Sequence, residues 1–157
     1  MRDCGEGWVA GQHVRLRIFF STRVFESHPL TIVNAPPSTS CSPVPEICLA
    51  AKVNGDWTKA VNAYAQKEQK RLLAEKEVGG VTDPFVQVMI DGPYGGCGLD
   101  LGDYERALLC AGGSGATFTL AILDDIVGRC VKLGRNGGEA TRTIEFVWCI
   151  PSFGAFR

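Results

Sequence analysis

The chain has 157 residues, of which 45% are hydrophobic and 21% charged, a composition typical of a globular protein with one ordinary core. Its formal net charge of −1 provides neither a basic field that would attract nucleic acid nor an acidic tail for a basic partner. No apolar run approaches the ~18 residues that cross a bilayer, and Asp3 and Glu6 stand where a signal peptide needs an apolar core. We therefore expect the chain as given to be soluble and cytoplasmic and to bind no nucleic acid.

The cysteines predict no cross-linked or metal-bound framework. There are seven of them, an odd number, and no two form a CxxC pair, so neither a zinc site nor a set of disulfides is indicated. Cys110 and Cys149 stand inside apolar, strand-like runs. We expect these two to be buried, reduced thiols.

The first third of the chain predicts strands and one exposed loop. Residues 12–19 alternate between apolar and polar side chains, which is the period of a half-buried antiparallel strand. A second extended stretch covers residues 30–33, and a third alternates over residues 47–53. Residues 35–45, between them, are rich in Pro and Ser and have the composition of an exposed loop that separates its neighbours.

A helical pattern follows and leads to a glycine-rich turn. Apolar residues near the helical period from Val61 to Leu72 predict an amphipathic helix, and its charged side is best explained as a solvated face. Gly79 and Gly80 end this segment. A fourth strand over residues 86–90 then delivers the turn Asp91-Gly92-Pro93-Tyr94-Gly95-Gly96, where the backbone can be approached closely.

The stretch from Leu108 to Leu120 joins a short apolar run to a helical pattern through a second glycine-rich turn. Such a turn presents backbone N–H groups at the positive end of a helix and can hold a phosphate. It fails the GxGxxG fingerprint because Phe118 fills the third glycine position, and no Lys-Ser or Lys-Thr pair follows as in a P-loop. Two interpretations stay open here: a Rossmann-like phosphate turn of another subtype, or a plain connection that needs glycine for its backbone angles.

The remainder of the chain completes one strand-helix-strand unit. The helical pattern from Thr117 stops at Gly134, and Asn136-Gly137-Gly138 turns the chain. Residues 143–150 form a strongly apolar stretch that suits a buried parallel strand.

Three motifs now stand in a fixed order. The first leads from Gly11-Gln12-His13-Val14 to His28-Pro29-Leu30-Thr31-Ile32, the second is Asp91-Gly92-Pro93-Tyr94-Gly95, and the third is Ala111-Gly112-Gly113-Ser114-Gly115-Ala116-Thr117. This order resembles the FAD- and NAD(P)-binding cytosolic region of fungal ferric reductases, relatives of the NADPH oxidases within the ferredoxin:NADP reductase-like group. The run from Thr143 to Trp148 also resembles that family's second nucleotide-domain strand, so the resemblance covers most of residues 8–148.

The resemblance implies that NADPH reduces FAD on the cytosolic face of a membrane and that electrons pass through membrane haem to ferric iron. It places the first motif along the flavin, through His28, Pro29, Leu30, Thr31 and Ile32. It places the second motif beneath the junction of the two cofactors, through Gly92, Pro93, Tyr94 and Gly95. The third motif would cradle the NADPH pyrophosphate, through Gly112, Gly113, Ser114, Gly115, Ala116 and Thr117. Leu30 departs from the family pattern, which has phenylalanine there, and so removes an aromatic contribution to flavin packing.

No catalytic side chain is expected, because hydride transfer between two cofactors requires their alignment and no general base. His13 and His28 are the only histidines, and no metal site is predicted. Arg15 and Arg17 could add charge beside the flavin phosphates, but we interpret them as an exposed strand face. The run Cys149-Ile150-Pro151-Ser152 lacks the acid that favours NAD, which indicates NADPH, and Arg157 could reach its 2′-phosphate.

The predicted fold class is α/β plus β. A partial antiparallel FAD-binding β-barrel with a helical insert would cover residues 1–97, and a partial Rossmann-like NADP-binding domain residues 98–157. Strands that the family has before and after this stretch are missing, so we expect a truncated chain. The alternative function is a non-catalytic nucleotide-binding or interaction fragment. A methyltransferase with a glycine-rich loop is a third interpretation, which explains neither of the first two motifs.

Overall fold

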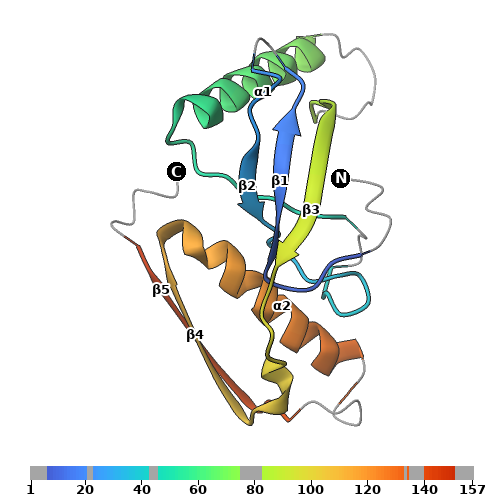
Figure 1. The fold of residues 1–157 in the computed structure, drawn as a ribbon, viewed down its shortest axis with the longest axis vertical. Helices are drawn as coiled ribbons and strands as arrows, with labels where there is room; N and C mark the ends of the chain where they lie inside the picture. The colour runs from blue at the N-terminus through green and yellow to red at the C-terminus, as the bar shows by residue number, and fades with distance from the viewer. Residues whose placement is uncertain are drawn as a thin grey trace. The chain divides into compact units, whose positions relative to one another are not determined.

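The structure is a computed structural model that describes residues 7–20, 23–42, 46–74, 83–132, 134 and 140–150. Its elements follow in the order β1 (Gln12–Ile18), β2 (His28–Thr31), α1 (Asp56–Ala74), β3 (Val88–Gly95), η1 (Leu101–Asp103), β4 (Arg106–Gly112), η2 (Gly113–Gly115), α2 (Ala116–Lys132) and β5 (Thr143–Cys149). Figure 1 labels the α-helices and the strands. The predicted breaks at Gly79, Gly80 and residues 136–138, and the residues after Ile150, lie outside the described part.

The chain divides into two compact units. Residues 1–14, 30–50 and 92–157 belong to the first, and residues 15–29 and 51–91 belong to the second. The division passes through β1, β2 and β3, so it does not coincide with any one loop. The predicted domain boundary at residue 97 stays a prediction.

β1 is the middle strand of a three-stranded sheet with the order β2-β1-β3. The end of β1 meets the start of β3, where the Phe19 N–H donates to the Gln87 carbonyl (2.9 Å). The start of β1 meets the end of β2, where the Ile32 N–H donates to the Gln12 carbonyl (2.9 Å). Both neighbours therefore run antiparallel to β1. The buried side chains of β1 alternate as the sequence predicts: Val14, Leu16 and Ile18.

The third predicted strand is wrong in its extent. Within residues 46–55, which the structure describes, the only strand-type pairing is a single bridge between Leu49 and Ile32. The two alanines that follow are exposed. An alternating pattern built on such small side chains buries little apolar area, so it gives a strand little support.

α1 buries one end and exposes its charged side, as predicted. Trp57 is buried in the first turn, and the ring of Tyr64 packs against Phe20 with centroids 5.6 Å apart. Arg71 is exposed and pairs with Glu68 one turn earlier (2.9 Å), a surface ion pair that contributes little to stability.

β4 and β5 form a parallel pair in which Leu109 lies opposite Phe146. α2 packs on one face of this pair and buries a cluster of apolar side chains, namely Ala10, Ala35, Leu109, Ala121, Ile122 and Ile126. The predicted strand-helix-strand order is therefore confirmed. Its assignment to the Rossmann type stays a prediction.

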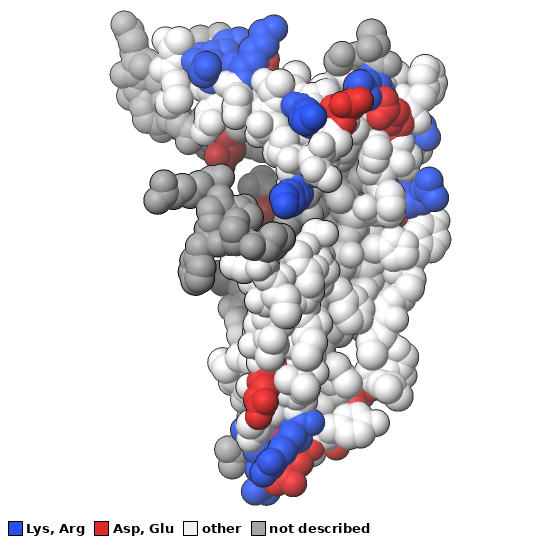
Figure 2. Space-filling model, turned by 90° about the vertical axis from the view of Figure 1, so that its left-hand side faces the viewer, with Lys and Arg blue, Asp and Glu red and all other residues white. Residues whose placement is uncertain are grey.

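The other face of the β4-β5 pair is open in the described part of the chain. Leu108 is 63% exposed and Val147 45% exposed, and Figure 2 shows a largely uncharged surface above the charged groups at the lower end. Cys110 and Cys149 are exposed as well, so the prediction that they are buried is wrong. An apolar strand predicts burial on both faces, whereas only one face here carries a described helix.

The loop after β2 is packed and does not merely separate its neighbours. Ala35 is fully buried and Ser40 is 1% exposed, which contradicts the exposed loop that the composition predicts. The loop lies against α2, where Gly128 has no side chain to keep it away: a Cβ there would collide with the Thr39 carbonyl.

The described elements give a fold of mixed helices and sheets. The described strands form an open three-stranded sheet and a parallel pair, and no closed barrel is formed among them. The barrel type, like the Rossmann type, stays a prediction. None of the described helices is long and apolar enough to span a membrane.

Candidate functional site

The first motif forms strand β2. His28 stacks on Trp57 with ring centroids 4.1 Å apart, and its Nε2 lies 3.3 Å from a carboxylate oxygen of Glu26. Pro29 is exposed. The histidine is therefore held by an aromatic ring and a carboxylate of its own unit, not pointing free into solvent.

The end of β2 enters the first compact unit. Leu30 and Thr31 are half-buried, whereas the side chain of Ile32 is fully buried and has no exposed surface to offer a ligand. Of these residues, Leu30 and Thr31 retain accessible side-chain surface.

A pocket of about 390 Å³ lies in the second unit and includes the residue just before His28. It is lined by Arg15, Arg17, Ser27, Met89, Ile90 and Asp91. Within the described residues, the Arg17 Nε is buried without a hydrogen-bond partner. A buried guanidinium nitrogen without an acceptor is costly, and the two arginines that line the pocket could hold an anion there, beside the carboxylate of Asp91.

Arg17 corrects the interpretation of an exposed strand face. Arg15 is exposed, but Arg17 is only half-exposed, and its Nε is buried. The alternation of β1 correctly puts both arginines on one face. It carries no information on Ser27 or on β3, which close that face into a pocket.

The second motif is held against the start of β1. The Gln12 side-chain amide donates to the Gly95 carbonyl (3.2 Å), and the His13 ring lies 6.0 Å from the Tyr94 ring. Gly92 has φ +122°, a conformation that an L side chain rarely adopts. A Cβ there would also crowd Tyr94, at 3.0 Å from its ring.

The third motif lies at the end of β4 and the start of α2. Gly113 has φ +51°, and a Cβ placed on Gly112, Gly113 or Gly115 would have no heavy atom within 4 Å. The indole of Trp148 donates to the Gly113 carbonyl (2.9 Å), which fixes the turn from the neighbouring strand β5. The space beside the glycines is open and faces helix N–H groups without intrahelical acceptors, so a phosphate could be held there.

Residues 11–13, which begin the first motif, contact the end of that motif and the second motif within the first unit. The Gln12 carbonyl accepts from Ile32, and its side chain donates to Gly95. Gly11, at φ +82°, leaves room for the Phe118 ring, which would lie 2.7 Å from a Cβ. Phe118 follows directly after the third motif, so α2 packs beside the same segment.

Phe118 accounts for the failed glycine fingerprint. In the GxGxxG pattern, a glycine on the helix permits close packing. Here the glycine is Gly11, on the segment that faces α2, and the helix carries the large ring instead. The signal in the sequence is a glycine just before β1, and nothing local connects it with residue 118.

Comparison with known proteins identifies the family. A sequence profile described as an FAD-binding domain matches residues 5–97, more than half of the chain. Respiratory burst oxidase homolog protein D of Arabidopsis thaliana is 30% identical over 151 residues, covering 85% of this chain. Ferric reduction oxidase 8, mitochondrial, of the same plant is 26% identical over 129 residues, covering 82% of this chain. The chain belongs to the FAD-binding region of the ferric reductase and NADPH oxidase family.

This family assignment confirms the prediction from the ordered motifs, while the fungal branch within it stays a prediction. The dual oxidase of Drosophila melanogaster is also similar, at 28% identity over 150 residues and 96% of this chain. The chain spans 16%, 15% and 9% of the lengths of these three relatives. The similarity therefore concerns one region of much longer proteins.

Proposed function

We propose that the chain is the flavin- and NADPH-binding module of a ferric reductase-type oxidoreductase. Electrons would pass from NADPH to FAD and, through a haem-bearing membrane partner, to ferric iron. The observation that supports this proposal is the hydrogen bonding of Gln12 to the end of the first motif and to the second, in a chain of the ferric reductase and NADPH oxidase family.

The residues proposed for FAD are His28, Pro29, Leu30, Thr31 and Ile32, together with Gly92, Pro93, Tyr94 and Gly95. Accessible surface on Leu30 and Thr31 supports direct contact with the flavin, whereas burial of Ile32 limits that residue to its backbone and a supporting role. Within the second unit, the pocket lined by Arg15, Arg17 and Ser27 offers two guanidinium groups to a phosphate.

The residues proposed for the NADPH pyrophosphate are Gly112, Gly113, Ser114, Gly115, Ala116 and Thr117. Open space beside the three glycines and the positive end of α2 support this placement. Ala116 is buried, so it would contribute its backbone and not its side chain.

The chemistry that FAD would supply is acceptance of a hydride, one proton and two electrons, from NADPH, which leaves as NADP⁺. The side chains of this module need only bind, align and exclude water. The stacked and hydrogen-bonded positions of His28, Tyr94 and Gln12 hold the backbone of the first two motifs in place for that task.

A flavin-binding experiment tests the proposal. The chain purified with added FAD is expected to be yellow, and NADPH is expected to bleach it under anaerobic conditions. A colourless protein contradicts the proposal. A yellow protein that only dithionite bleaches contradicts its NADPH half.

Gly112→Val tests the proposed NADPH cradle. Gly112 has an extended backbone (φ −118°, ψ 122°) that valine adopts readily, and no atom lies within 4 Å of its Cβ, so the variant is expected to fold. It should stay yellow, lose bleaching by NADPH and retain bleaching by dithionite. Gly55→Val, in similarly open space before α1, is the control. Normal bleaching of Gly112→Val by NADPH would show that the phosphates bind elsewhere.

A non-catalytic binding module is the second candidate. The open apolar face of β4 and β5, with Leu108 and Val147 exposed, favours it because such a face is suited to another protein surface. A chain that binds FAD or NADPH but shows no flavin reduction would support this second candidate.

A further inference from the structure

One carboxylate of α2 holds both ends of the loop that follows β2. Asp124 accepts the Ala35 N–H on Oδ2 and the Cys41 N–H on Oδ1, each at 2.9 Å. The six residues from Ala35 to Ser40 are thereby closed against the helix. Each of these bonds is made to a charged acceptor, the stronger kind of hydrogen bond.

Three further positions of α2 contact the same loop. Gly128 leaves room for the Thr39 carbonyl, and the Lys132 ammonium donates to the Pro37 carbonyl (2.8 Å). Residues 124, 128 and 132 are spaced by four, so they form one face of the helix. Asp125, beside them, accepts from the Thr39 hydroxyl. We call these four positions, Asp124, Asp125, Gly128 and Lys132, the loop clasp.

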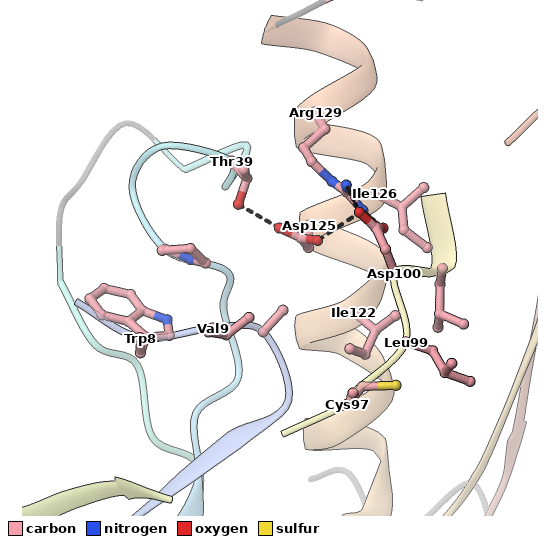
Figure 3. A pocket seen from close by; sticks show the side chains of 14 residues that line it. Trp8, Val9, Thr39, Cys97, Leu99, Asp100, Ile122, Asp125, Ile126 and Arg129 are labelled. Carbon is pink, nitrogen blue, oxygen red and sulfur yellow. Dashed lines mark hydrogen bonds and ion pairs between the residues drawn. The ribbon is translucent and has the colours of Figure 1, made fainter. Parts of the chain in front are cut away.

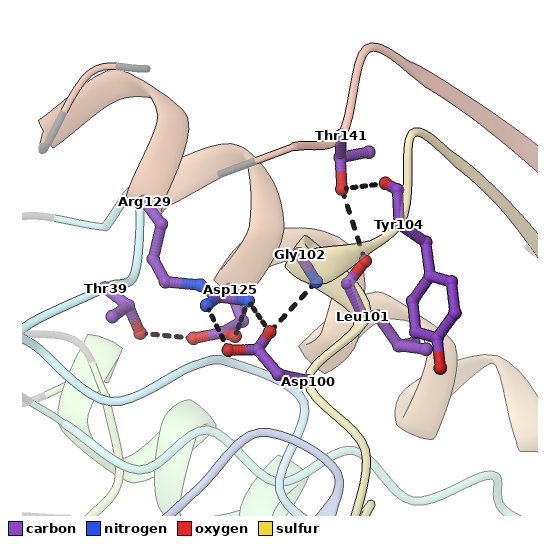
Figure 4. Close-up of polar contacts among 8 residues, drawn as sticks. All are labelled: Thr39, Asp100, Leu101, Gly102, Tyr104, Asp125, Arg129 and Thr141. Atoms are coloured by element: carbon purple, nitrogen blue, oxygen red, sulfur yellow. Dashed lines mark hydrogen bonds and ion pairs between the residues drawn. The ribbon is translucent and has the colours of Figure 1, made fainter. Parts of the chain in front are cut away.

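A second contact joins α2 to the segment that follows the Gly92–Gly95 turn. Arg129 donates two hydrogen bonds to Asp100 (2.7 and 2.9 Å) and pairs with Asp125 (3.2 Å). Asp100 also accepts from the Gly102 N–H (2.9 Å). Figure 4 shows this network linking the helix to the segment at Asp100, and Figure 3 shows it beside a cavity of about 420 Å³ lined partly by Trp8 and Ile122.

The two segments that contact α2 closely follow the first and second motifs in the chain. Ala35 comes four residues after Thr31, and Asp100 comes five residues after Gly95. α2 itself begins directly after Gly115. One helix thus carries the proposed NADPH cradle at its start and, about 12 Å further along its axis, the carboxylate that holds the end of the proposed flavin strand.

We propose that Asp124 is a positioning residue that sets the end of strand β2 relative to the glycine turn at the start of α2. This role rests on the proposed function, in which Leu30 and Thr31 contact the flavin. Hydride transfer needs its two reacting atoms within about 3.5 Å, and an error of about 1 Å costs about 100-fold in rate. Loss of the loop clasp would leave both binding sites intact and loosen only their alignment. It would therefore lower the rate of hydride transfer and not the affinity for either cofactor.

Asp124→Asn is the variant that tests this role. The amide keeps the shape but replaces one acceptor oxygen with a donor, which faces an N–H group and breaks one end of the clasp. We expect the affinities for FAD, from flavin fluorescence, and for NADP⁺, from calorimetry, to stay within about 3-fold. We expect the limiting rate of flavin bleaching at saturating NADPH to fall at least about 10-fold. Asp103→Asn, an exposed carboxylate of the same unit, is the matched control.

Alkylation of Cys41 reports on the clasp without any cofactor. Cys41 is exposed, yet partial loss of solvent raises the pKa of its thiol, and the neighbouring Asp124 carboxylate raises that pKa further. Asp124→Asn should therefore speed modification of Cys41 by iodoacetamide, measured peptide by peptide, and leave Cys48, which is also exposed, unchanged.

The outcomes separate this role from the proposed function. Normal bleaching of the wild type with an unchanged rate in Asp124→Asn overturns the positioning role alone. A wild type that binds neither cofactor overturns the proposed function and this role with it. If Asp124→Asn does not fold, Ser40→Ala removes the hydroxyl that bonds to Asp124, and it must then slow bleaching without weakening either affinity. An unchanged rate in Ser40→Ala overturns the role.

Discussion

Arg17 is the residue whose surroundings most directly indicate a ligand. It lines the pocket that includes Ser27, and its buried Nε has no acceptor among the described residues. A phosphate is a good acceptor for a guanidinium, because two parallel bonds can form. We therefore expect this pocket to bind a ligand with phosphates more tightly than a ligand without them.

Comparison of FAD with riboflavin tests this assignment. Arg17→Met should lower the affinity for FAD by about 10-fold, which corresponds to about 1.4 kcal/mol, and leave the affinity for riboflavin unchanged, since riboflavin carries no phosphate. Arg142→Met, an exposed arginine in a loose pair with Glu105, is the control. Equal losses for both ligands would indicate that Arg17 supports the fold of the pocket and does not contact phosphate.

For single residues, the sequence predicted the element in which each residue lies better than it predicted the residues that surround it. Glycines 112, 113 and 115 lie in open space at the start of a helix, as a phosphate turn requires. The roles of Arg17 and Gly11 depend on residues that are distant in the chain, Ser27 and Phe118 among them. A local pattern carries no information on such partners, so only the structure relates them.

At the scale of elements, α2 and the loop after β2 form one packed assembly. Periodicity predicted the helix and its apolar side correctly, because both are local properties. The loop was wrongly expected to be exposed, since Pro and Ser report backbone preference and not burial. Its packing depends on one absent side chain, that of Gly128, and on acceptors supplied by Asp124.

Gly128→Ala tests the close packing of helix and loop. In a free helix this change stabilises by about 1 kcal/mol, because alanine has the higher helix propensity. Here the added Cβ collides with the Thr39 carbonyl, and we expect a net destabilisation of about 1–3 kcal/mol in urea unfolding. Val131→Ala, at a position 72% exposed on the same helix, should have no cost. A stabilised Gly128→Ala variant would contradict the packing described here.

At the scale of the whole molecule, the carboxylates of Asp100 and Asp124 are expected to make the free energy of unfolding depend on pH. Hydrogen bonds from Arg129 are the main cause that lowers the pKa of Asp100. Burial raises the pKa of Asp124, but hydrogen bonds from the loop bring it below its usual value, through Ser40, Cys41 and Ala35. A carboxylate with a lowered folded-state pKa stabilises fully above its unfolded pKa of about 3.9, and this contribution is lost as the pH falls through the folded pKa.

We therefore expect the urea midpoint to be constant with respect to these two groups near neutral pH and to fall from about pH 5 downward, as the pH approaches and passes below their unfolded pKa. The double variant Asp100→Asn, Asp124→Asn should be less stable at about pH 6 and should lose part of this pH dependence. The difference in pH dependence between the wild type and the double variant gives the contribution of these two carboxylates, apart from that of the others. An equal fall in both would contradict the assignment.

At the same scale, the family predicted from three ordered motifs is confirmed, and the chain spans 9% to 16% of the lengths of the relatives described above. The step proposed for this chain is reduction of the flavin, and the experiments above measure that step.

The hydrogen bond from Trp148 to the Gly113 carbonyl has an optical consequence. An indole at that position senses a change in local charge, so a nucleotide beside the glycines would alter its emission. Trp57 stacks on His28 of β2, so its emission would respond to a flavin bound beside that strand. Trp8 is the remaining tryptophan of the chain. Replacing one tryptophan at a time with phenylalanine would show which indole responds to each cofactor. Intrinsic fluorescence could then follow the binding of each cofactor without an attached dye.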